Sequence, residues 1–284
     1  MLHTRLNEIS CPFVKRMSYW TNKAILITGG SAGLGFALAE ACAQAGARVA
    51  IVARNETKLN LALEKLRVIQ PEAIAIVADV TKQGDVERMV AETLAKFGVL
   101  DVLINNVGIS MRGEALKTSP EDYARLFECN FLSVVRCTQA AAPHLIAARG
   151  HIVNIGSLAS KSASRFLGAY PASKFPLAAF SQQLRLELAP HGVHTLLVCP
   201  GPLQRDDANE RYASQAGDLP PAARQPGGGV KLKGLDPTKL AVLILRACQR
   251  RQPELVVPWK AKLLFALSQL WPSFGDWLVR KMSS

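Results

Sequence analysis

Residues 23–46 read KAILITGGSAGLGFALAEACAQAG, a short apolar run that passes through a glycine-rich turn into a helical pattern. The run AILITG (24–29) is apolar on both faces, as expected of a strand buried within a parallel sheet. After the turn, apolar residues recur at helical spacing up to the next glycine, a residue type that commonly ends a helix. In the turn, Gly29 permits a tight bend, Gly33 lets a phosphate approach the backbone, and Gly35 lets helix and strand pack closely. This strand–turn–helix unit predicts a dinucleotide-binding site at the helix N-terminus.

The rest of the chain repeats this alternation of apolar strands and amphipathic helices. Further strands are predicted at 48–54, 73–80, 100–106, 150–157, 192–201 and 254–258. Helices are predicted at 35–46, 56–69, 84–98, 120–146, 170–190 and 236–251. Continuous apolar strands separated by helices indicate a parallel sheet covered on both sides, and right-handed crossovers make that sheet doubly wound. We therefore expect an α/β fold, with a single Rossmann-type domain over 21–258 that has about seven strands and helices on both faces.

Three segments depart from this pattern. Residues 1–20 have little periodicity and no continuous apolar stretch, so we expect a disordered N-terminal arm and no secretory signal. Residues 201–235 are rich in Gly, Pro and polar residues and follow the carboxyl end of a strand, where ligands bind in open α/β sheets. We expect this segment to be a substrate lid. Residues 259–284 extend beyond the last strand as an amphipathic C-terminal tail.

The composition is that of a folded protein in a reducing compartment. Of the 284 residues, 49% are hydrophobic, which is enough for a sizeable core. The cysteines show neither C-x-x-C spacing nor clustering with histidine, which favours free thiols, a cytoplasmic location and the absence of a metal site. The six cysteines are Cys11, Cys42, Cys129, Cys137, Cys199 and Cys248. The sequence has no apolar run long enough to predict a membrane-spanning helix.

The net charge of +12 arises from basic residues that are spread along the chain. Because there is no basic block, recognition stripe or stacking-aromatic motif, nucleic-acid binding is not expected. A generally basic surface suits anionic ligands such as the phosphates of a dinucleotide.

The end of the second strand bears on which dinucleotide is bound. An acidic residue at this position would bind a ribose 2′-hydroxyl, whereas this chain has Ala53 followed by Arg54. A guanidinium matches a 2′-phosphate, so NADP(H) is predicted in preference to NAD, with Ser31 as a second phosphate donor. The alternative interpretation of Arg54 is a solvated surface charge.

Six motifs follow one another along the chain: TGGSAGLG (28–35), ADV (78–80), NNVG (105–108), ECNFLSV (128–134), NIGSLAS (154–160) and YPASK (170–174). In order and spacing they resemble the short-chain dehydrogenase/reductase family, over about Lys23 to Pro258. The resemblance implies a small carbonyl or alcohol substrate, and a homodimer or homotetramer that pairs through the long helices. It implies a catalytic set of Asn130, Ser157, Tyr170 and Lys174. It implies cofactor contacts from Gly29, Ser31, Gly33, Leu34, Gly35, Arg54, Asp79, Val80, Asn106, Tyr170, Lys174, Pro200, Gly201 and Leu203.

Tyr170 and Lys174 lie four residues apart, on one face of a predicted helix, where they can act on the same small target. The pattern is common by itself, and the surrounding motifs make it an acid–base pair. Reducing a ketone with hydride requires a proton for the alkoxide, but a free tyrosine, with a pKa of about 10, holds its proton too tightly for the reverse reaction. A cationic lysine and the positive nicotinamide ring lower that pKa. In the family, the residue at Ser157 holds the substrate oxygen and the residue at Asn130 retains a water.

Both Ser157 and Asn130 also have simpler interpretations, as a helix cap or turn residue and as a packed or helix-kinking residue. Three positions depart from the family pattern. Arg205 falls near the place of a threonine that contacts the nicotinamide carboxamide. Pro176 lies inside a predicted helix, where we expect a local kink. Val107 replaces an alanine beside the cofactor.

The C-terminal tail has Leu263, Leu267, Leu270 and Trp271 at helical spacing, flanked by lysine and arginine. It is too short to cross a bilayer but suits a peripheral membrane contact. The alternatives are packing over the substrate pocket and burial at a subunit contact. A tail beside the site favours a hydrophobic, steroid- or lipid-like substrate.

These patterns predict an NADP(H)-dependent oxidoreductase that interconverts a carbonyl and a secondary alcohol. The alternative from another class is a dinucleotide-sensing regulatory protein that keeps the fold without turnover. A sensor would be expected to lose the Tyr/Lys pair, which this sequence retains.

Overall fold

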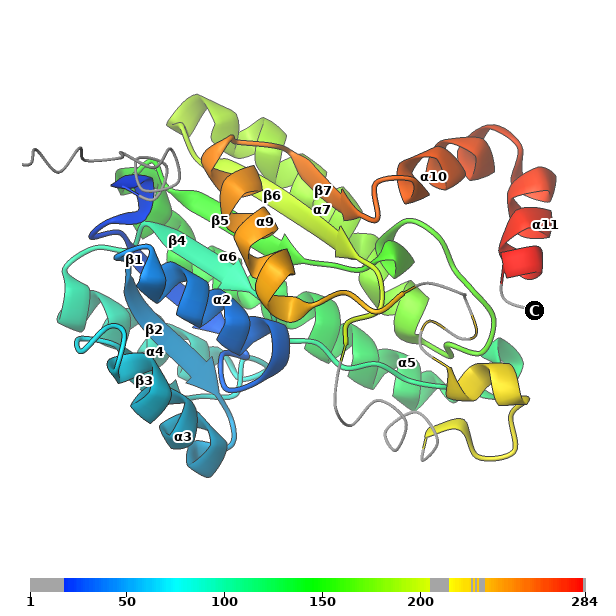
Figure 1. Cartoon of the computed structure of the whole chain (residues 1–284), viewed down its shortest axis with the longest axis horizontal. Coiled ribbons are helices and arrows are strands. Elements are labelled where there is room, and N and C mark those ends of the chain that lie inside the picture. The colour runs from blue at the N-terminus through cyan, green and yellow to red at the C-terminus, as the bar shows by residue number, and fades with distance from the viewer. Residues whose placement is uncertain (1–17, 205–214, 226, 228, 230–232, 283–284) are drawn as a thin grey trace, which may run out of the picture.

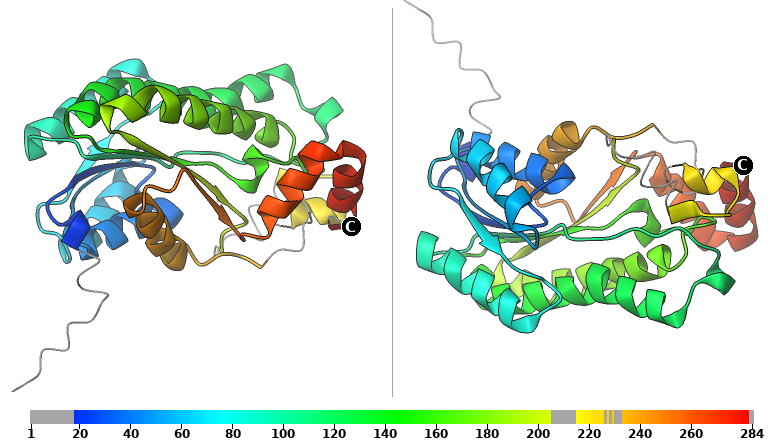
Figure 2. Two further views of the ribbon diagram at one scale, coloured as in Figure 1. Left: turned by 90° about the horizontal axis from the view of Figure 1, so that it is seen from above. Right: turned by 90° about the horizontal axis from the view of Figure 1, so that it is seen from below.

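The computed structural model describes residues 18–204, 215–225, 227, 229 and 233–282, and in it one parallel sheet lies between two layers of helices (Figures 1 and 2). The strands are β1 (Ala24–Thr28), β2 (Arg48–Ala53), β3 (Ile74–Val77), β4 (Val102–Asn105), β5 (His151–Ile155), β6 (His194–Pro200) and β7 (Glu254–Val257). Their order across the sheet is β3-β2-β1-β4-β5-β6-β7, and each neighbouring pair is parallel. The prediction of a seven-stranded, doubly wound sheet is confirmed.

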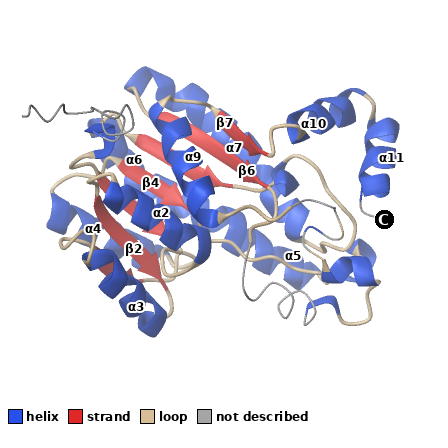
Figure 3. Ribbon diagram, in the orientation of Figure 1, coloured by secondary structure: helices blue, strands red, loops and turns tan. Residues whose placement is uncertain are grey.

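Helices occupy most of the connections between strands (Figure 3). They are α2 (Gly33–Gln44), α3 (Glu56–Arg67), α4 (Gln83–Phe97), α5 (Pro120–Phe127), α6 (Ser133–Ala147), α7 (Tyr170–Leu188), α9 (Pro237–Gln249), α10 (Ala261–Leu270) and α11 (Pro272–Met282). Short 3-10 turns are η1 (Ser18–Trp20), η2 (Ala115–Lys117), η4 (Leu158–Ser160), η5 (Ala189–His191) and η6 (Pro221–Arg224), and η3 (Glu128–Leu132) is a π-helical turn. The helices α2, α3 and α9 cover one face of the sheet, and α4, α6 and α7 cover the other (Figure 2).

The central strands are mostly apolar because both of their faces are covered. Along β1, Ile25 and Ile27 belong to the core beneath α2 and α9, whereas Leu26 belongs to the core beneath α4 and α6. Every residue of β1, β5 and β6 is buried. Alternate side chains along a strand thus pack into two different cores, one on each face of the sheet. This is why these strands are nearly continuous hydrophobic runs in the sequence.

The strand order places a crevice next to β1. From β1 the chain runs outward through β2 and β3, and then returns to β4 on the opposite side of β1. The connections that leave β1 and β4 therefore diverge, which opens a crevice at the carboxyl ends of these two strands. Ligands of open α/β sheets bind at such a position.

One expectation about the elements is confirmed with a local change, and another is wrong in part. The helix predicted for 120–146 is helical throughout, but the π-helical turn Glu128–Leu132 separates α5 from α6 within it. The disordered arm expected for 1–20 is wrong for its last three residues, because they form a 3-10 turn and Trp20 is only 2% exposed. Residues 1–17 lie outside the described part of the chain.

The C-terminal tail forms two helices, α10 and α11, that meet at Trp271 and Pro272 and lie beyond the end of the sheet (Figure 1). None of the helices in the described ranges has both the length and the apolar character that crossing a membrane requires.

Gly35 lies where the first helix approaches the first strand most closely. A Cβ atom at this position would lie 2.1 Å from the backbone carbonyl oxygen of Gly29. Only a shift of α2 away from this turn could relieve such a clash. Close packing of helix on strand, expected from the sequence, therefore requires glycine here.

We predict that Gly35→Ala destabilises the protein by about 1–3 kcal/mol or more, because the added methyl overpacks the turn. Gly84→Ala is the matched control, since Gly84 lies in the first turn of α4 and an added Cβ would have no atom within 4 Å. That change removes a glycine from a helix and should stabilise the protein by up to about 1 kcal/mol. Urea denaturation of the two variants measures both effects, and equal stabilities would contradict the packing described for Gly35.

Candidate active site

One large cavity, of about 1200 Å³, opens at the carboxyl edge of the sheet beside the crevice between β1 and β4. It draws residues from the ends of β1 to β6 and from the first turn of α7. All of the predicted site residues except Asn130 line it. The predicted residues in its wall are Gly29, Ser31, Gly33, Leu34, Gly35, Arg54, Asp79, Val80, Asn106, Ser157, Tyr170, Lys174, Pro200, Gly201 and Leu203.

The turn between β1 and α2 has the shape and the donors that a phosphate needs. Gly29 and Gly33 have φ angles of 66° and 55°, in the left-handed region that favours glycine. A Cβ at Gly33 would meet no atom within 4 Å, so this residue faces open space. Ala32, the N-cap of α2, supplies no side-chain hydrogen bond to the first turn. The first backbone N–H groups and the positive end of the helix are left to a ligand, and the turn fits the pyrophosphate of a dinucleotide.

Asn106 holds this turn against the end of β4. Its Nδ2 donates to the carbonyl oxygens of Thr28, at 3.1 Å, and Gly29, at 3.2 Å. Its backbone N–H donates to Thr28 Oγ1 at 3.0 Å. The neighbouring Val107 fits because position 29 is a glycine: a Cβ atom on residue 29 would lie only 3.3 Å from Val107 Cγ2. The amide of Asn106 thus fixes the backbone from which the phosphate-binding turn starts.

Arg54 and Asp79 lie at the ends of β2 and β3, where an adenosine would be expected. Arg54 Nη1 is 3.7 Å from Asp79 Oδ2, and 69% of the arginine side chain is exposed. Asp79 Oδ1 accepts from the backbone N–H and the hydroxyl of Thr81, at 3.0 and 2.8 Å. Burial raises the pKa of Asp79, but these hydrogen bonds and the charge of Arg54 outweigh it, so the pKa lies below its ordinary value. A single long contact to a carboxylate leaves most of the Arg54 guanidinium facing solvent.

Lys174 is a buried cation, 4% exposed, in the first turns of α7. Its Nζ donates to the carbonyl oxygen of Ile155, the last residue of β5, at 3.2 Å. The ammonium lies against Gly108, where a Cβ would be 3.0 Å from Nζ, so glycine is what makes room for it. Burial lowers the pKa of Lys174 to about 8, which leaves the group mostly protonated at neutral pH.

Asn130 is fully buried and is not among the residues that line the cavity, so its expected role as a site residue stays a prediction. It lies in the π-helical turn between α5 and α6. Its Oδ1 accepts from the backbone N–H of Ile109 at 2.8 Å, and its Nδ2 donates to the carbonyl oxygen of Ile109 at 2.9 Å. Nδ2 also donates to Ser173 Oγ at 2.8 Å. Asn130 therefore joins the loop after β4 to α7, next to Lys174, and the packing interpretation is the one that these contacts support.

Ser157 is both a cap and a cavity residue. Its Oγ accepts from the backbone N–H of Ala159 at 3.1 Å, and its own backbone N–H donates to Ser160 Oγ at 3.2 Å, which together cap η4. A capping hydroxyl uses an acceptor lone pair and keeps its O–H donor, so capping is compatible with binding a substrate oxygen. Tyr170, the first residue of α7, is half-buried and lines the same cavity.

The two ends of the predicted lid, 201–235, lie side by side. The backbone N–H of Leu235 donates to the carbonyl oxygen of Pro202, and that of Gln204 donates to the carbonyl oxygen of Leu235, both at 2.8 Å. Arg112, which the sequence did not single out, lines the cavity and donates to the carbonyl oxygens of Ala223, at 2.8 Å, and Gln225, at 3.3 Å. This buried side chain holds η6 near the cavity.

Of the departures from the family pattern, Pro176 can be located in the structure and Arg205 cannot. Helix α7 runs from Tyr170 to Leu188 and includes Pro176 in its interior, so the proline does not end the helix. Arg205, expected near the nicotinamide, lies outside the described residues.

The C-terminal helices form an apolar wall of the cavity, as one of the alternative interpretations of the tail anticipated. The wall residues from α10 and α11 are Leu263, Leu264, Phe265, Leu267, Leu278 and Val279. The two helices pack closely at Gly275, where a Cβ would lie 2.4 Å from Ser268 Oγ. Helical spacing in the sequence indicated an apolar face, but which surface it would meet depends on the turn between the two helices.

Although no cysteine clusters with histidine along the sequence, the structure brings two histidines and one cysteine together in space. One ring nitrogen each of His151 and His194, and the sulfur of Cys248, all lie within 4.8 Å of one another. The residues are far apart in the sequence and meet because β5 and β6 pair at their first residues. The expectation of unpaired thiols holds for the five cysteines in the described residues.

A glycine turn that suits a phosphate lines the same cavity as Tyr170 and Lys174, as expected of a dinucleotide-dependent oxidoreductase. The chain belongs to the short-chain dehydrogenase/reductase family, because the family described as "short chain dehydrogenase" matches residues 23–216. It is 31% identical to the uncharacterized oxidoreductase YxnA of Bacillus subtilis, over 92% of this chain and 72% of that protein. It is also 31% identical to the ketoacyl reductase HetN of Nostoc, over 93% and 90% of the two chains.

A solved short-chain dehydrogenase/reductase from Burkholderia phymatum, in complex with NAD, superposes with a TM-score of 0.77. It is 26% identical, over 88% of this chain and 95% of that one. The family expected from the sequence motifs is therefore confirmed, together with its fold and its nucleotide-binding, oxidoreductase character.

Proposed function

We propose that this protein interconverts a carbonyl and a secondary alcohol, with NADP(H) as the hydride carrier and Tyr170 as the proton carrier. The observation that carries the proposal is the buried ammonium of Lys174, which lines the same cavity as Tyr170 and starts one helical turn further along α7. Burying a cation costs free energy. Stabilising the phenolate that forms when Tyr170 gives up its proton is a function that would account for this cost.

A bound nicotinamide dinucleotide would supply or take up the hydride. In the reduction, the Ser157 hydroxyl donates a hydrogen bond to the substrate oxygen and orients it. Tyr170 then donates its phenolic proton to that oxygen as negative charge develops on it. Lys174 stabilises the phenolate that remains, because its positive charge is held in surroundings that water screens poorly. In the oxidation the same groups act in reverse.

The residues that would hold the dinucleotide are those of the cavity wall. The glycine turn and the first turn of α2 suit the pyrophosphate, Asp79 and Val80 the adenine, and Lys174 the ribose next to the nicotinamide. Pro200, Gly201 and Leu203, beyond β6, suit the nicotinamide end. The exposed guanidinium of Arg54, with Ser31 across the turn, supports a 2′-phosphate and therefore NADP(H), although the solved relative described above binds NAD.

The apolar wall contributed by α10 and α11 supports a hydrophobic, steroid- or lipid-like substrate. Six aliphatic or aromatic side chains of the two helices face the cavity and offer contact area to an apolar molecule. One relative is named a ketoacyl reductase, and a carbonyl on an acyl chain would be a substrate of this apolar kind.

The solvent-exposed side chains of the same segment support a peripheral contact with a membrane surface. Outside the cavity wall, the segment exposes Trp259, Leu270, Trp271, Phe274 and Trp277, each by 47% or more. Lys260, Lys262 and Lys281 are exposed beside them. Aromatic rings next to cationic side chains suit the headgroup region of anionic lipids, from which an apolar substrate would reach the cavity directly.

The remaining proposals concern the assembly and the compartment. We place the protein in the cytoplasm because the described cysteines are unpaired. We also propose a homodimer or homotetramer formed through α5, α6 and α7, where Phe127, Phe175 and Leu186 are exposed by 37%, 41% and 72%. The alternative function, a dinucleotide sensor without turnover, is less well supported because a sensor has no need for a lysine buried beside a tyrosine.

We predict that Tyr170→Phe lowers kcat/KM for carbonyl reduction by about 10²–10⁴-fold, because the ring stays while the proton donor is lost. NADPH binding, followed by cofactor fluorescence, should change little. Tyr123→Phe on α5 is the matched control and should keep full activity. NADPH oxidation over a panel of ketones measures the effect. Full activity without the Tyr170 hydroxyl would exclude the assigned role, and binding without turnover in the wild type would favour the sensor.

We predict that Arg54→Gln weakens NADPH binding by about 10–100-fold, the cost of one hydrogen bond to a charged partner. NADH binding should be nearly unchanged, since NADH has no 2′-phosphate, and it serves as the internal control. Equal losses for the two dinucleotides would show that Arg54 acts through Asp79 or the fold and not through a phosphate.

We predict that the wild-type protein sediments with vesicles that contain phosphatidylserine and not with neutral vesicles. Replacing Trp271 and Trp277 with alanine should reduce the bound fraction several-fold, because the two side chains are 61% and 47% exposed and neither belongs to the buried core. Leu116→Ala, which removes an exposed apolar side chain far from the tail in sequence, is the control. Failure of the wild type to sediment with either vesicle would reject the membrane contact and leave the enzymatic proposal intact.

A further inference from the structure

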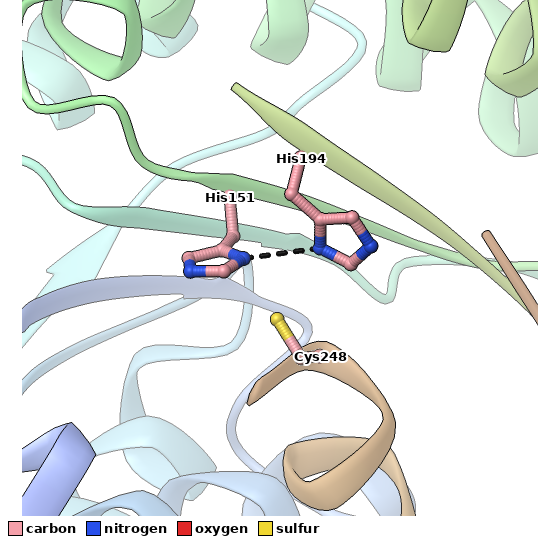
Figure 4. Close-up of side chains that lie close together, drawn as sticks. All are labelled: His151, His194 and Cys248. Atoms are coloured by element: carbon pink, nitrogen blue, oxygen red, sulfur yellow. Dashed lines mark hydrogen bonds between the residues drawn. The ribbon is translucent and has the colours of Figure 1, made fainter. Parts of the chain in front are cut away.

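A second cluster of reactive side chains lies at the opposite edge of the sheet from the cavity. His151 and His194 are the first residues of β5 and β6 and pair in register, and Cys248 lies near the end of α9 (Figure 4). All three are buried, with exposures of 1%, 6% and 1%. Because β5 runs from His151 to Ile155, about 13 Å separates this cluster from the Lys174 contact. The cluster therefore takes no part in binding a substrate at the cavity.

The side chains converge on a single point. The Nδ1 atoms of His151 and His194 are 3.0 Å apart, and Figure 4 shows the thiol of Cys248 directed at the space between the rings. One nitrogen of each ring and the sulfur lie within 4.8 Å of one another. The rings are nearly perpendicular, at 80°, as two imidazoles on adjacent corners of a tetrahedron can be.

The outer nitrogens of both rings are already fixed by other groups. His194 Nε2 lies 2.8 Å from the carbonyl oxygen of Gln252, which can only accept, so this nitrogen carries a proton. His151 Nε2 lies 2.5 Å from the hydroxyl of Tyr19. A backbone carbonyl or a hydroxyl on the outer nitrogen is the usual arrangement around histidines that bind a metal through the other nitrogen.

Without an ion, the same atoms make a directed chain of hydrogen bonds. Tyr19 would donate to His151 Nε2, His151 Nδ1 would donate to His194 Nδ1, and His194 Nε2 would donate to Gln252. This chain accounts for the two rings. It does not involve the thiol of Cys248, a soft donor that lies beside two imidazole nitrogens and, like His151, close enough to Arg251 and Lys23 to feel their charges.

We propose that His151, His194 and Cys248 form a structural Zn²⁺ site that ties β5, β6 and α9 together at the amino edge of the sheet. Two imidazoles and a thiolate are donors that zinc favours, and a water would complete four ligands. Zinc–nitrogen bonds of about 2.0–2.1 Å place two such nitrogens about 3.3 Å apart, so the rings need to separate by only a few tenths of an ångström. The sulfur needs to approach by up to about 1.3 Å, which rotation of the Cys248 side chain can supply.

The protons balance in this site. Zinc displaces the thiol proton of Cys248, which is released to solvent, and the thiolate offsets one of the two positive charges. The ring proton of His151 moves from Nδ1 to Nε2, from which it donates to the oxygen of Tyr19. His194 keeps its proton on Nε2 and its hydrogen bond to Gln252. Every ring nitrogen therefore keeps a partner when the metal binds.

The test uses untagged full-length protein, purified without chelator, with zinc measured by mass spectrometry. We expect about one zinc per chain in the wild type and in Cys137→Ser, a change to another buried thiol outside the cluster, and at least a tenfold loss in Cys248→Ser. Zinc added to the chelator-treated wild type should raise its melting temperature. Cobalt in place of zinc should give the visible sulfur-to-metal absorption of a thiolate ligand, which needs no variant.

Three results would overturn the proposal. One is a wild-type chain with less than about a tenth of an equivalent of zinc and no thermal shift on its addition, which leaves the hydrogen-bonded histidines as the account of the cluster. A second is zinc that is retained in full by Cys248→Ser, and a third is a cobalt spectrum without a thiolate band. Ketone reduction should be the same in the wild type with and without zinc, so the outcome is independent of the proposed function.

Discussion

A hydrogen bond of 3.2 Å joins the ammonium of Lys174 to the carbonyl oxygen of Ile155, inside the protein. Moving a cation out of water costs several kcal/mol, so its surroundings must offer a fixed acceptor and a space of the right size. Ile155 offers the acceptor at the end of β5, and Gly108 offers the space at the end of β4. Because Tyr170 is on the same helix, the contact also sets where the phenol lies. The ends of β4 and β5, together with α7, thereby fix the positions of Lys174 and Tyr170.

Two side-chain amides hold the loops of the site in place, where glycine residues and irregular backbone make few packing contacts. Asn106 holds the carbonyls at the start of the phosphate-binding turn, and Asn130 holds both backbone groups of Ile109. Each amide replaces backbone partners that a regular strand or helix would have supplied. The π-helical turn at Asn130 serves the same purpose, since an extra residue in the turn directs that side chain inward, a device found often near functional sites. Polar contacts therefore hold the glycine turn and the loop after β4 at the edge of the cavity.

The sequence was enough to predict the sheet and the part of the cavity wall that lies at the strand ends and the glycine turn, because both follow from local patterns. Apolar strands and the glycine turn identify the fold, and parallel strands bring their carboxyl ends to one edge. What it could not predict depends on contacts distant in the chain. Asn130 bonds Ile109 from behind the cavity, and the sequence offered only a motif for it. The apolar wall of α10 and α11 depends on a turn at Trp271, and the pairing of His151 with His194 depends on strand register.

Titration of Lys174 itself tests this placement most directly. In protein labelled with ¹³C at the lysine ε-carbons, the resonance lost in Lys174→Met identifies this residue, and its shift can be followed between about pH 6 and pH 11. Because burial disfavours the charged form, the midpoint should fall near the pKa of about 8 given by its surroundings, with the proton held below that pH and lost above it. A midpoint at the ordinary lysine pKa of about 10.4 would contradict a buried ammonium at the centre of the site.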